Sequence, residues 1–213
     1  MQVDAAGRAH LVWQDNIINF IPNVDDPGNV EIYYCRLSPE GAPETAPLRV
    51  STAIGRSQRP TIAVEPDGTF HVFWCDNRDR GSGGTNGFPI AIWYRRSLPG
   101  LGFGHEKRFV YAPNDRLNPM AAVDARGTIN VVWEDYAGGN GDIYYRQITP
   151  SGGWDPFTTR LSATSGASQA PALLAEADGT LHLLWSDLLS ADDLNVYYRR
   201  GQAGATTPVT LRV

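Results

Sequence analysis

Short apolar segments alternate with polar turns along the whole chain, and no segment has the spacing of a long amphipathic helix. Four segments of the second quarter are predicted to be strands: Pro60–Val64, Phe70–Trp74, Ala91–Arg95 and Arg108–Tyr111. A tight turn, Glu65–Gly68, joins the first two, and its glycine is expected to take a positive φ. The pattern therefore predicts an all-β fold built from short antiparallel strands.

The same pattern of residues occurs four times. Each copy has an acidic residue, a glycine three positions later, a tryptophan six positions after the glycine, and an aspartate two positions after the tryptophan. The four Trp-x-Asp pairs are Trp13 and Asp15, Trp74 and Asp76, Trp133 and Asp135, and Trp185 and Asp187. An aromatic segment such as Ile143-Tyr144-Tyr145 follows each pair, and successive tryptophans are 61, 59 and 52 residues apart. Units of this length and composition are typical of the blades of a β-propeller.

The repeat predicts a single β-propeller domain, residues 1–213, made of four four-stranded antiparallel blades. The blades are expected at about 1–51, 52–112, 113–162 and 163–213. The first unit has only Met1–Val3 in its first strand and the last unit ends with its own fourth strand, so we expect no strand exchange between the chain ends. A four-bladed ring, a part of a larger ring, and two copies joined as eight blades all agree with this pattern.

The third copy is the most regular, and it carries a resemblance. It contains Val131-Val132-Trp133-Glu134-Asp135 and then Asp142-Ile143-Tyr144-Tyr145-Arg146. This pattern resembles the extracellular propeller repeats of sialidase-type (BNR-like) and TolB-type proteins. The resemblance implies blade architecture and a secreted or periplasmic location. Because such repeats occur in glycosidases, lectins and scaffolds, it does not imply one activity.

Composition excludes several classes of partner. The chain has 18 basic and 23 acidic residues, a net charge of -5, without a cluster of Lys and Arg, so we expect neither nucleic acid nor an anionic membrane as a partner. No apolar run approaches the roughly 20 residues of a membrane-spanning helix. The two cysteines, Cys35 and Cys75, fall on strands of different blades, and we expect two free thiols.

Residues that recur in every copy are predicted to be structural. Each repeat tryptophan should be buried between blades, and each following aspartate should accept backbone N–H groups in a turn. His10, His71 and His182 align three residues before the tryptophan, and Asn130 occupies this place in the third copy. Because asparagine keeps hydrogen bonding but not metal affinity, we expect buried, hydrogen-bonded residues rather than a metal site. No catalytic residue is singled out.

The connections between the second and third strands of the first two blades are long and differ from the other copies, and variable loops often carry function. Candidate ligand-binding residues in these two loops are Phe20, Asn23, Asp25, Asp26, Asn77, Asp79 and Phe88. Loop variation without function is an equal alternative. No cofactor is expected; hard oxygens at Asp76, Asn77 and Asp79, or at Asp25 and Asp26, would suit only calcium, without matching the twelve-residue calcium loop.

Three functions agree with the sequence. The first is a non-catalytic module whose rim loops bind a glycan or a protein. The second is a sialidase-like glycoside hydrolase, or part of one; no pair of carboxylates is singled out by its spacing, which weighs against an enzyme. The third is a scaffold whose role is assembly, with a second copy completing a larger propeller.

Overall fold

The structure is a computed structural model. It describes residues 1–15, 30–53, 55–80, 90–98, 100, 102–110, 114–190, 193–202 and 209–212. Within these ranges the regular structure is all strand apart from one 3-10 turn, Arg78–Arg80. No helix in this part of the chain is long and apolar enough to cross a membrane.

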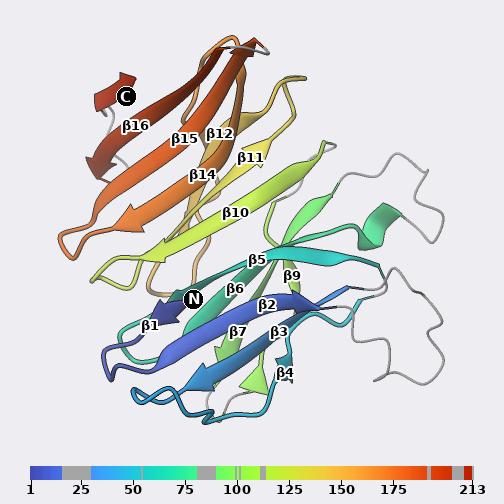
Figure 1. Ribbon diagram of the computed structural model, residues 1–213, viewed down its shortest axis with the longest axis vertical. Coiled ribbons are helices and arrows are strands. Elements are labelled where there is room, and N and C mark those ends of the chain that lie inside the picture. The colour runs from blue at the N-terminus through green and yellow to red at the C-terminus, as the bar shows by residue number, and fades with distance from the viewer. Residues whose placement is uncertain are drawn as a thin grey trace. The chain divides into compact units, whose positions relative to one another are not determined.

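Four antiparallel sheets, here called sheets 1 to 4, follow one another along the chain (Figure 1). Sheet 1 consists of β1 (Gln2–Val3), β2 (Ala9–Asp15), β3 (Glu31–Leu37) and β4 (Leu48–Arg49). Sheet 2 consists of β5 (Ser57–Val64), β6 (Phe70–Asp76), β7 (Ala91–Leu98) and β9 (Lys107–Arg108), with β8 (Gly102–Phe103) paired to the end of β7. Sheet 3 consists of β10 (Arg116–Val123), β11 (Ile129–Asp135), β12 (Asp142–Ile148) and β13 (Thr159–Arg160). Sheet 4 consists of β14 (Ala167–Ala175), β15 (Thr180–Ser190), β16 (Asp193–Gln202) and β17 (Val209–Arg212). The all-β prediction is confirmed.

Each sheet repeats one register. The repeat tryptophan lies opposite the first aromatic residue of the third strand, as in Trp74 opposite Trp93 and Trp133 opposite Tyr144. The glycines of the first turn all take a positive φ, which residues with a Cβ rarely adopt. Their φ values are 78° at Gly7, 85° at Gly68, 79° at Gly127 and 86° at Gly179.

The first strand of sheet 2 is longer than predicted. In sheet 2 the strand begins at Ser57 rather than Pro60, because a β-bulge between Gln58 and Thr61 carries the pairing past the proline. A proline has no N–H to give to the ladder, and a bulge interrupts the ladder at that point. The residue before the proline takes a positive φ in three sheets: 55° at Arg59, 50° at Asn118 and 51° at Ala170. The last strand of sheet 2, β9, covers Lys107–Arg108, so the predicted bounds of Arg108–Tyr111 are wrong.

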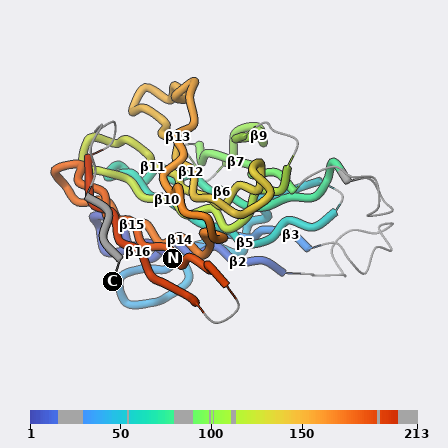
Figure 2. The backbone as a smooth tube through the Cα atoms, turned by 90° about the horizontal axis from the view of Figure 1, so that it is seen from above, coloured from blue at the N-terminus to red at the C-terminus, as the bar shows by residue number. Residues whose placement is uncertain are grey.

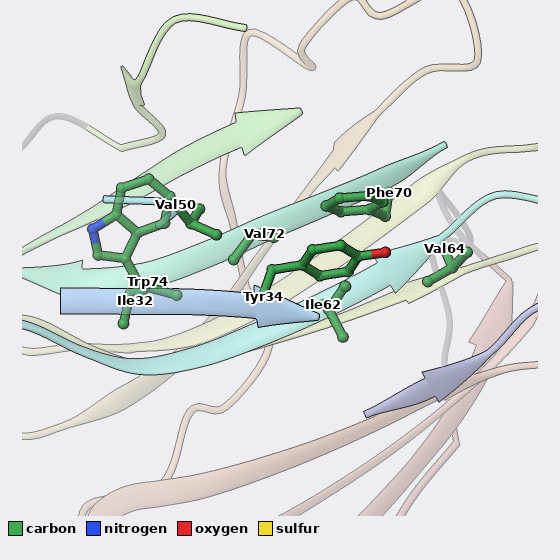
Figure 3. Packing of buried hydrophobic residues seen from close by; sticks show 8 residues of the cluster. All are labelled: Ile32, Tyr34, Val50, Ile62, Val64, Phe70, Val72 and Trp74. Atoms are coloured by element: carbon green, nitrogen blue, oxygen red, sulfur yellow. The ribbon is translucent and has the colours of Figure 1, made fainter. Parts of the chain in front are cut away.

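The chain forms two compact units, Met1–Leu117 and Asn118–Val213. In the first, the core joins sheets 1 and 2, where the Tyr34 ring stacks on the Phe70 ring with 4.1 Å between centroids (Figure 3). In the second, Val132, Ile143 and Tyr145 of sheet 3 are buried with Leu183 and Trp185 of sheet 4. Within each unit, therefore, neighbouring sheets pack face to face.

Three of the four repeat tryptophans are buried as predicted. Trp74 and Trp133 are fully buried and Trp185 is almost so, whereas Trp13 is partly exposed. Cys35 lies on β3 and Cys75 on β6, and they form no disulfide with each other.

Candidate functional site

Two of the seven candidate loop residues, Asn77 and Asp79, fall within the described residues; Phe20, Asn23, Asp25, Asp26 and Phe88 lie outside them. The Asn77 Oδ1 accepts a hydrogen bond from the Arg56 backbone N–H at 2.6 Å. The Asp79 carboxylate accepts a hydrogen bond from the Arg108 guanidinium. Both side chains therefore have protein partners, and the structure brings them to the same end of sheet 2.

The residue between them, Arg78, is the centre of this region. Its guanidinium lies 3.8 Å from the centroid of the Trp93 ring. It forms ion pairs with Asp76 at 2.6 Å and with Glu106 at 2.5 Å. Burial disfavours its charge, but the hydrogen bonds that Arg78 donates to these two carboxylates, together with their negative charges, outweigh that effect and raise the pKa of Arg78.

We call Asp76, Arg78, Asp79, Trp93, Glu106 and Arg108 the rim cluster. Glu106 also holds the connection between β4 and β5, because its Oε1 accepts hydrogen bonds from the Thr52 backbone N–H at 2.7 Å and the Thr52 hydroxyl at 3.0 Å. The Nε of Arg78 and the Nε1 of Trp93 are buried and have no hydrogen-bond partner among the described residues. The cluster thus combines an aromatic ring with charged donors and acceptors.

Sequence reasoning missed Arg78, Trp93 and Glu106. Trp93 lies at a repeat position where the other three copies have tyrosine, and this departure from the repeat is the signal that could have identified it. Glu106 lies in an irregular stretch without a pattern. No group of three His, Cys, Asp or Glu side chains in the described residues is placed to hold a metal ion.

The repeat histidines link a carboxylate to a tyrosine. In sheet 2 the two ring nitrogens of His71 lie 2.8 Å from the Tyr94 hydroxyl and 2.7 Å from Glu65. The same arrangement joins Asp4, His10 and Tyr34 in sheet 1 and Glu176, His182 and Tyr198 in sheet 4. In sheet 3 the Asn130 Oδ1 accepts the hydrogen bond from the Tyr145 hydroxyl at 2.7 Å. The prediction that these residues are hydrogen-bonded is confirmed, and their recurrence makes the motif structural.

Burial sets the protonation of these groups. It lowers the pKa of His10 and of His71, and the hydrogen bonds that these rings make to the Asp4 and Glu65 carboxylates only partly oppose it. Burial also raises the pKa of Tyr34 to about 12. The lowered pKa values favour the neutral imidazoles of His10 and His71 at pH 7.

Glu134 is a buried carboxylate whose oxygens are fully engaged. Its Oε1 accepts hydrogen bonds from the Asn118 side-chain amide at 2.5 Å and the Ala170 backbone N–H at 2.6 Å. Its Oε2 accepts one from the Tyr136 hydroxyl at 3.2 Å. In sheet 1 the equivalent residue is Gln14, whose Oε1 accepts the Arg59 backbone N–H at 2.7 Å. Because a neutral amide makes the same link at the equivalent position, Glu134 serves to join neighbouring sheets.

The repeat aspartates follow the predicted turn role in two sheets and depart from it in one. Asp76 and Asp135 each accept a backbone N–H from two residues ahead, at 2.8 and 2.9 Å. Asp187 has no such turn, because β15 continues to Ser190 and stays paired with β16. Its Oδ2 accepts hydrogen bonds from the Thr164 and Ser168 hydroxyls, while its buried Oδ1 has no partner among the described residues. The turn prediction is wrong for Asp187.

No family model matches the chain, and no curated protein does. Solved structures do resemble it. A protein of unknown function from Dyadobacter fermentans matches with a TM-score of 0.69 at 11% identity, over 99% of this chain and 66% of that one. A PL25 ulvan lyase matches with a TM-score of 0.63 at 12% identity, over 99% of this chain and 56% of that one. Zg3597, a family 117 glycoside hydrolase from Zobellia galactanivorans, matches with a TM-score of 0.58 at 12% identity, over 99% of this chain and 66% of that one.

These likenesses show the fold. The neighbours are propeller-type proteins that include glycoside hydrolases and polysaccharide lyases, and this chain has the propeller-like all-β fold. At 11–12% identity the likeness does not extend to activity. The chain spans between about half and two thirds of the length of these three neighbours.

Proposed function

We propose that this chain is a secreted or periplasmic propeller module that binds a glycan at the rim cluster without cleaving it. The observation that carries the proposal is the Arg78–Trp93 stack, flanked by the carboxylates of Asp76 and Glu106. Protein sites for sugars combine an aromatic surface with a few placed donors and acceptors, which match the apolar face and the hydroxyls of a sugar ring. The carbohydrate-active neighbours support a glycan as the ligand.

The state of the acidic residues supports binding rather than catalysis. Hydrolysis of a glycosidic bond uses two carboxylates, one of which gives a proton to the leaving group. In the rim cluster Asp76 and Glu106 are ion-paired with Arg78, and Asp79 is ion-paired with Arg108. In the second unit Glu134 accepts three hydrogen bonds. These carboxylates are occupied by structural partners, so a substrate would have to displace those partners before it could use them.

The test is titration calorimetry with arabino-oligosaccharides, ulvan oligosaccharides and sialyllactose. Arg78→Gln removes the guanidinium from the Trp93 ring, and it should weaken binding of whichever glycan binds by at least about tenfold. Arg36→Gln is the matched control, because Arg36 forms an ion pair with Glu44 away from the rim cluster. Equal affinities of the two variants, or no binding of any of the three glycans, would contradict the proposal.

A second candidate function is carbohydrate cleavage, and one observation favours it. Arg59 is exposed on the first strand of sheet 2, and it is the charged member of an equivalent set whose other residues are Asn118 in sheet 3 and Ala170 in sheet 4. An exposed guanidinium there would suit the carboxylate of an acidic sugar. New reducing ends released from the same glycans, and lost in Arg59→Gln but not in Arg36→Gln, would establish this function in place of the first.

A further inference from the structure

One face of sheet 4 exposes a row of large apolar side chains, and we call it the outer face. Its side chains come from β14, β15 and β16. These three strands lie side by side in both views (Figures 1 and 2). Its members and their exposed fractions are Leu174 at 61%, Leu184 at 43%, Leu188 at 39%, Leu194 at 65% and Val196 at 42%. Contiguous apolar side chains of this size are rarely left in water unless they mark an interface.

The repeat identifies what kind of surface the outer face accepts. Leu184 is equivalent to Val132 in sheet 3, and Val196 is equivalent to Ile143. Both sheet 3 residues are 0% exposed, because they pack against Leu183 and Trp185 on the facing side of sheet 4. In sheet 3, the residues at these positions pack against the tryptophan-bearing face of sheet 4. The outer face of sheet 4 therefore carries the positions that would pack against a tryptophan-bearing face of another sheet.

Sheet 1 carries a tryptophan-bearing face that is not fully covered. Leu11 and Trp13 are equivalent to Leu183 and Trp185, and both are partly exposed. Val3, near the start of the same face, is 59% exposed. The chain thus carries both halves of the interface by which sheet 4 packs against sheet 3.

Two polar links that join neighbouring sheets inside a unit have no counterpart at these two faces. Where neighbouring sheets are joined inside a unit, an arginine after the aromatic pair crosses to a backbone carbonyl: Arg95 to Val50 at 2.5 Å and Arg199 to Leu161 at 2.6 Å. Sheet 1 has Cys35 at this position and offers no such donor. Glu134 joins sheet 3 to sheet 4, but its equivalent Ser186 gives its hydroxyl to Gln169 of its own sheet. Within the described residues, these two faces therefore offer each other apolar packing.

We infer that the outer face of sheet 4 binds the Leu11–Trp13 face of sheet 1 from a second copy of this chain. Two such contacts, related by a twofold axis, join two copies and cover both faces of each copy. The inference is independent of the proposed glycan site, because the residues that carry it lie outside the rim cluster.

The experiment measures mass by light scattering across a dilution series of the intact chain. A mass of twice 23.3 kDa that falls on dilution is expected for the wild type. Leu184→Glu and Leu11→Glu should each raise the dissociation constant by at least about tenfold, because each puts a charge into the apolar contact. Leu194→Glu repeats the first test at a side chain exposed enough to leave folding unaffected. Leu98→Glu is the matched control, since Leu98 is 46% exposed on β7 but on neither face.

Mixing the variants identifies which faces meet. An equimolar mixture of Leu184→Glu and Leu11→Glu contains pairs with one unaltered contact, so its mass should exceed that of either variant alone. If Leu11→Glu stays as dimeric as the wild type, the outer face pairs with itself or with another surface, and the inference is wrong. A monomeric wild type at all concentrations also overturns it.

Discussion

Replacing Trp133 by alanine tests whether the repeat tryptophan holds each sheet in place. The Trp133 ring is fully buried and stacks on Tyr144 with 6.3 Å between centroids, and its Nε1 donates a hydrogen bond to Asp135 at 3.4 Å. Removing a buried ring of this size costs the lost transfer energy and the energy of the cavity, so the free energy of unfolding should fall by about 3–5 kcal/mol. Trp133→Phe keeps most of the burial and loses a long hydrogen bond, and it should cost about 1–3 kcal/mol.

Trp13→Ala is the matched control, because Trp13 has the same repeat position but is partly exposed. It should cost about 1–2 kcal/mol, since less apolar area is lost. Urea denaturation followed by far-ultraviolet circular dichroism measures all three variants, and this signal does not depend on the six tryptophans of the chain. Because the chain has two compact units, the transition is first examined for a second step.

The comparison between Trp133→Ala and Trp13→Ala tests whether burial of the tryptophan ring stabilises the sheet. If Trp133→Ala costs no more than Trp13→Ala, burial of the ring is not what stabilises sheet 3. A change in the slope of the transition, rather than in its midpoint, would instead place the effect in the unfolded chain.

Two further predictions concern the cysteines and the histidines. Thiol labelling of the denatured, unreduced protein should find two thiols, and the native protein should react slowly at Cys35, because burial raises its pKa; no labelling at all would contradict the strand assignment. Stability should fall as the pH drops from about 7.5 to about 5, because burial lowers the pKa of His71 in the folded chain while the unfolded chain takes up protons near 6.5. His71→Asn, which copies Asn130 of sheet 3, should flatten this dependence, and stability that rises on acidification would refute it.

The fold was predictable because the repeat ties local pattern to burial. Trp74 and Trp133 recur with the same neighbours, and the periodicity of two around them assigns their side chains to one face of a strand. The turn glycine at Gly68 was predictable because few residues other than glycine adopt a positive φ.

The features that could not be predicted depend on contacts between residues far apart in the sequence. Glu106 acquires its role from Arg78 and Thr52, which are 28 and 54 residues away. The bulge at Arg59 is fixed by Gln14 of the neighbouring sheet, so the sequence around Pro60 alone favoured a strand that starts at the proline. The extension of β15 beyond Asp187 likewise follows from pairing with β16 rather than from the repeat.

Recurrence and departure therefore carry different information in this chain. A side chain that recurs, such as His71 or Asp135, is engaged by partners that recur with it, and this gives it a structural role. Positions that break the repeat are where the chain can acquire a function that one sheet alone has. Trp93 replaces a tyrosine and receives Arg78, which gives sheet 2 its rim cluster. Cys35 replaces an arginine and leaves sheet 1 without the link that Arg95 and Arg199 make, which leaves apolar packing to join this face to another sheet.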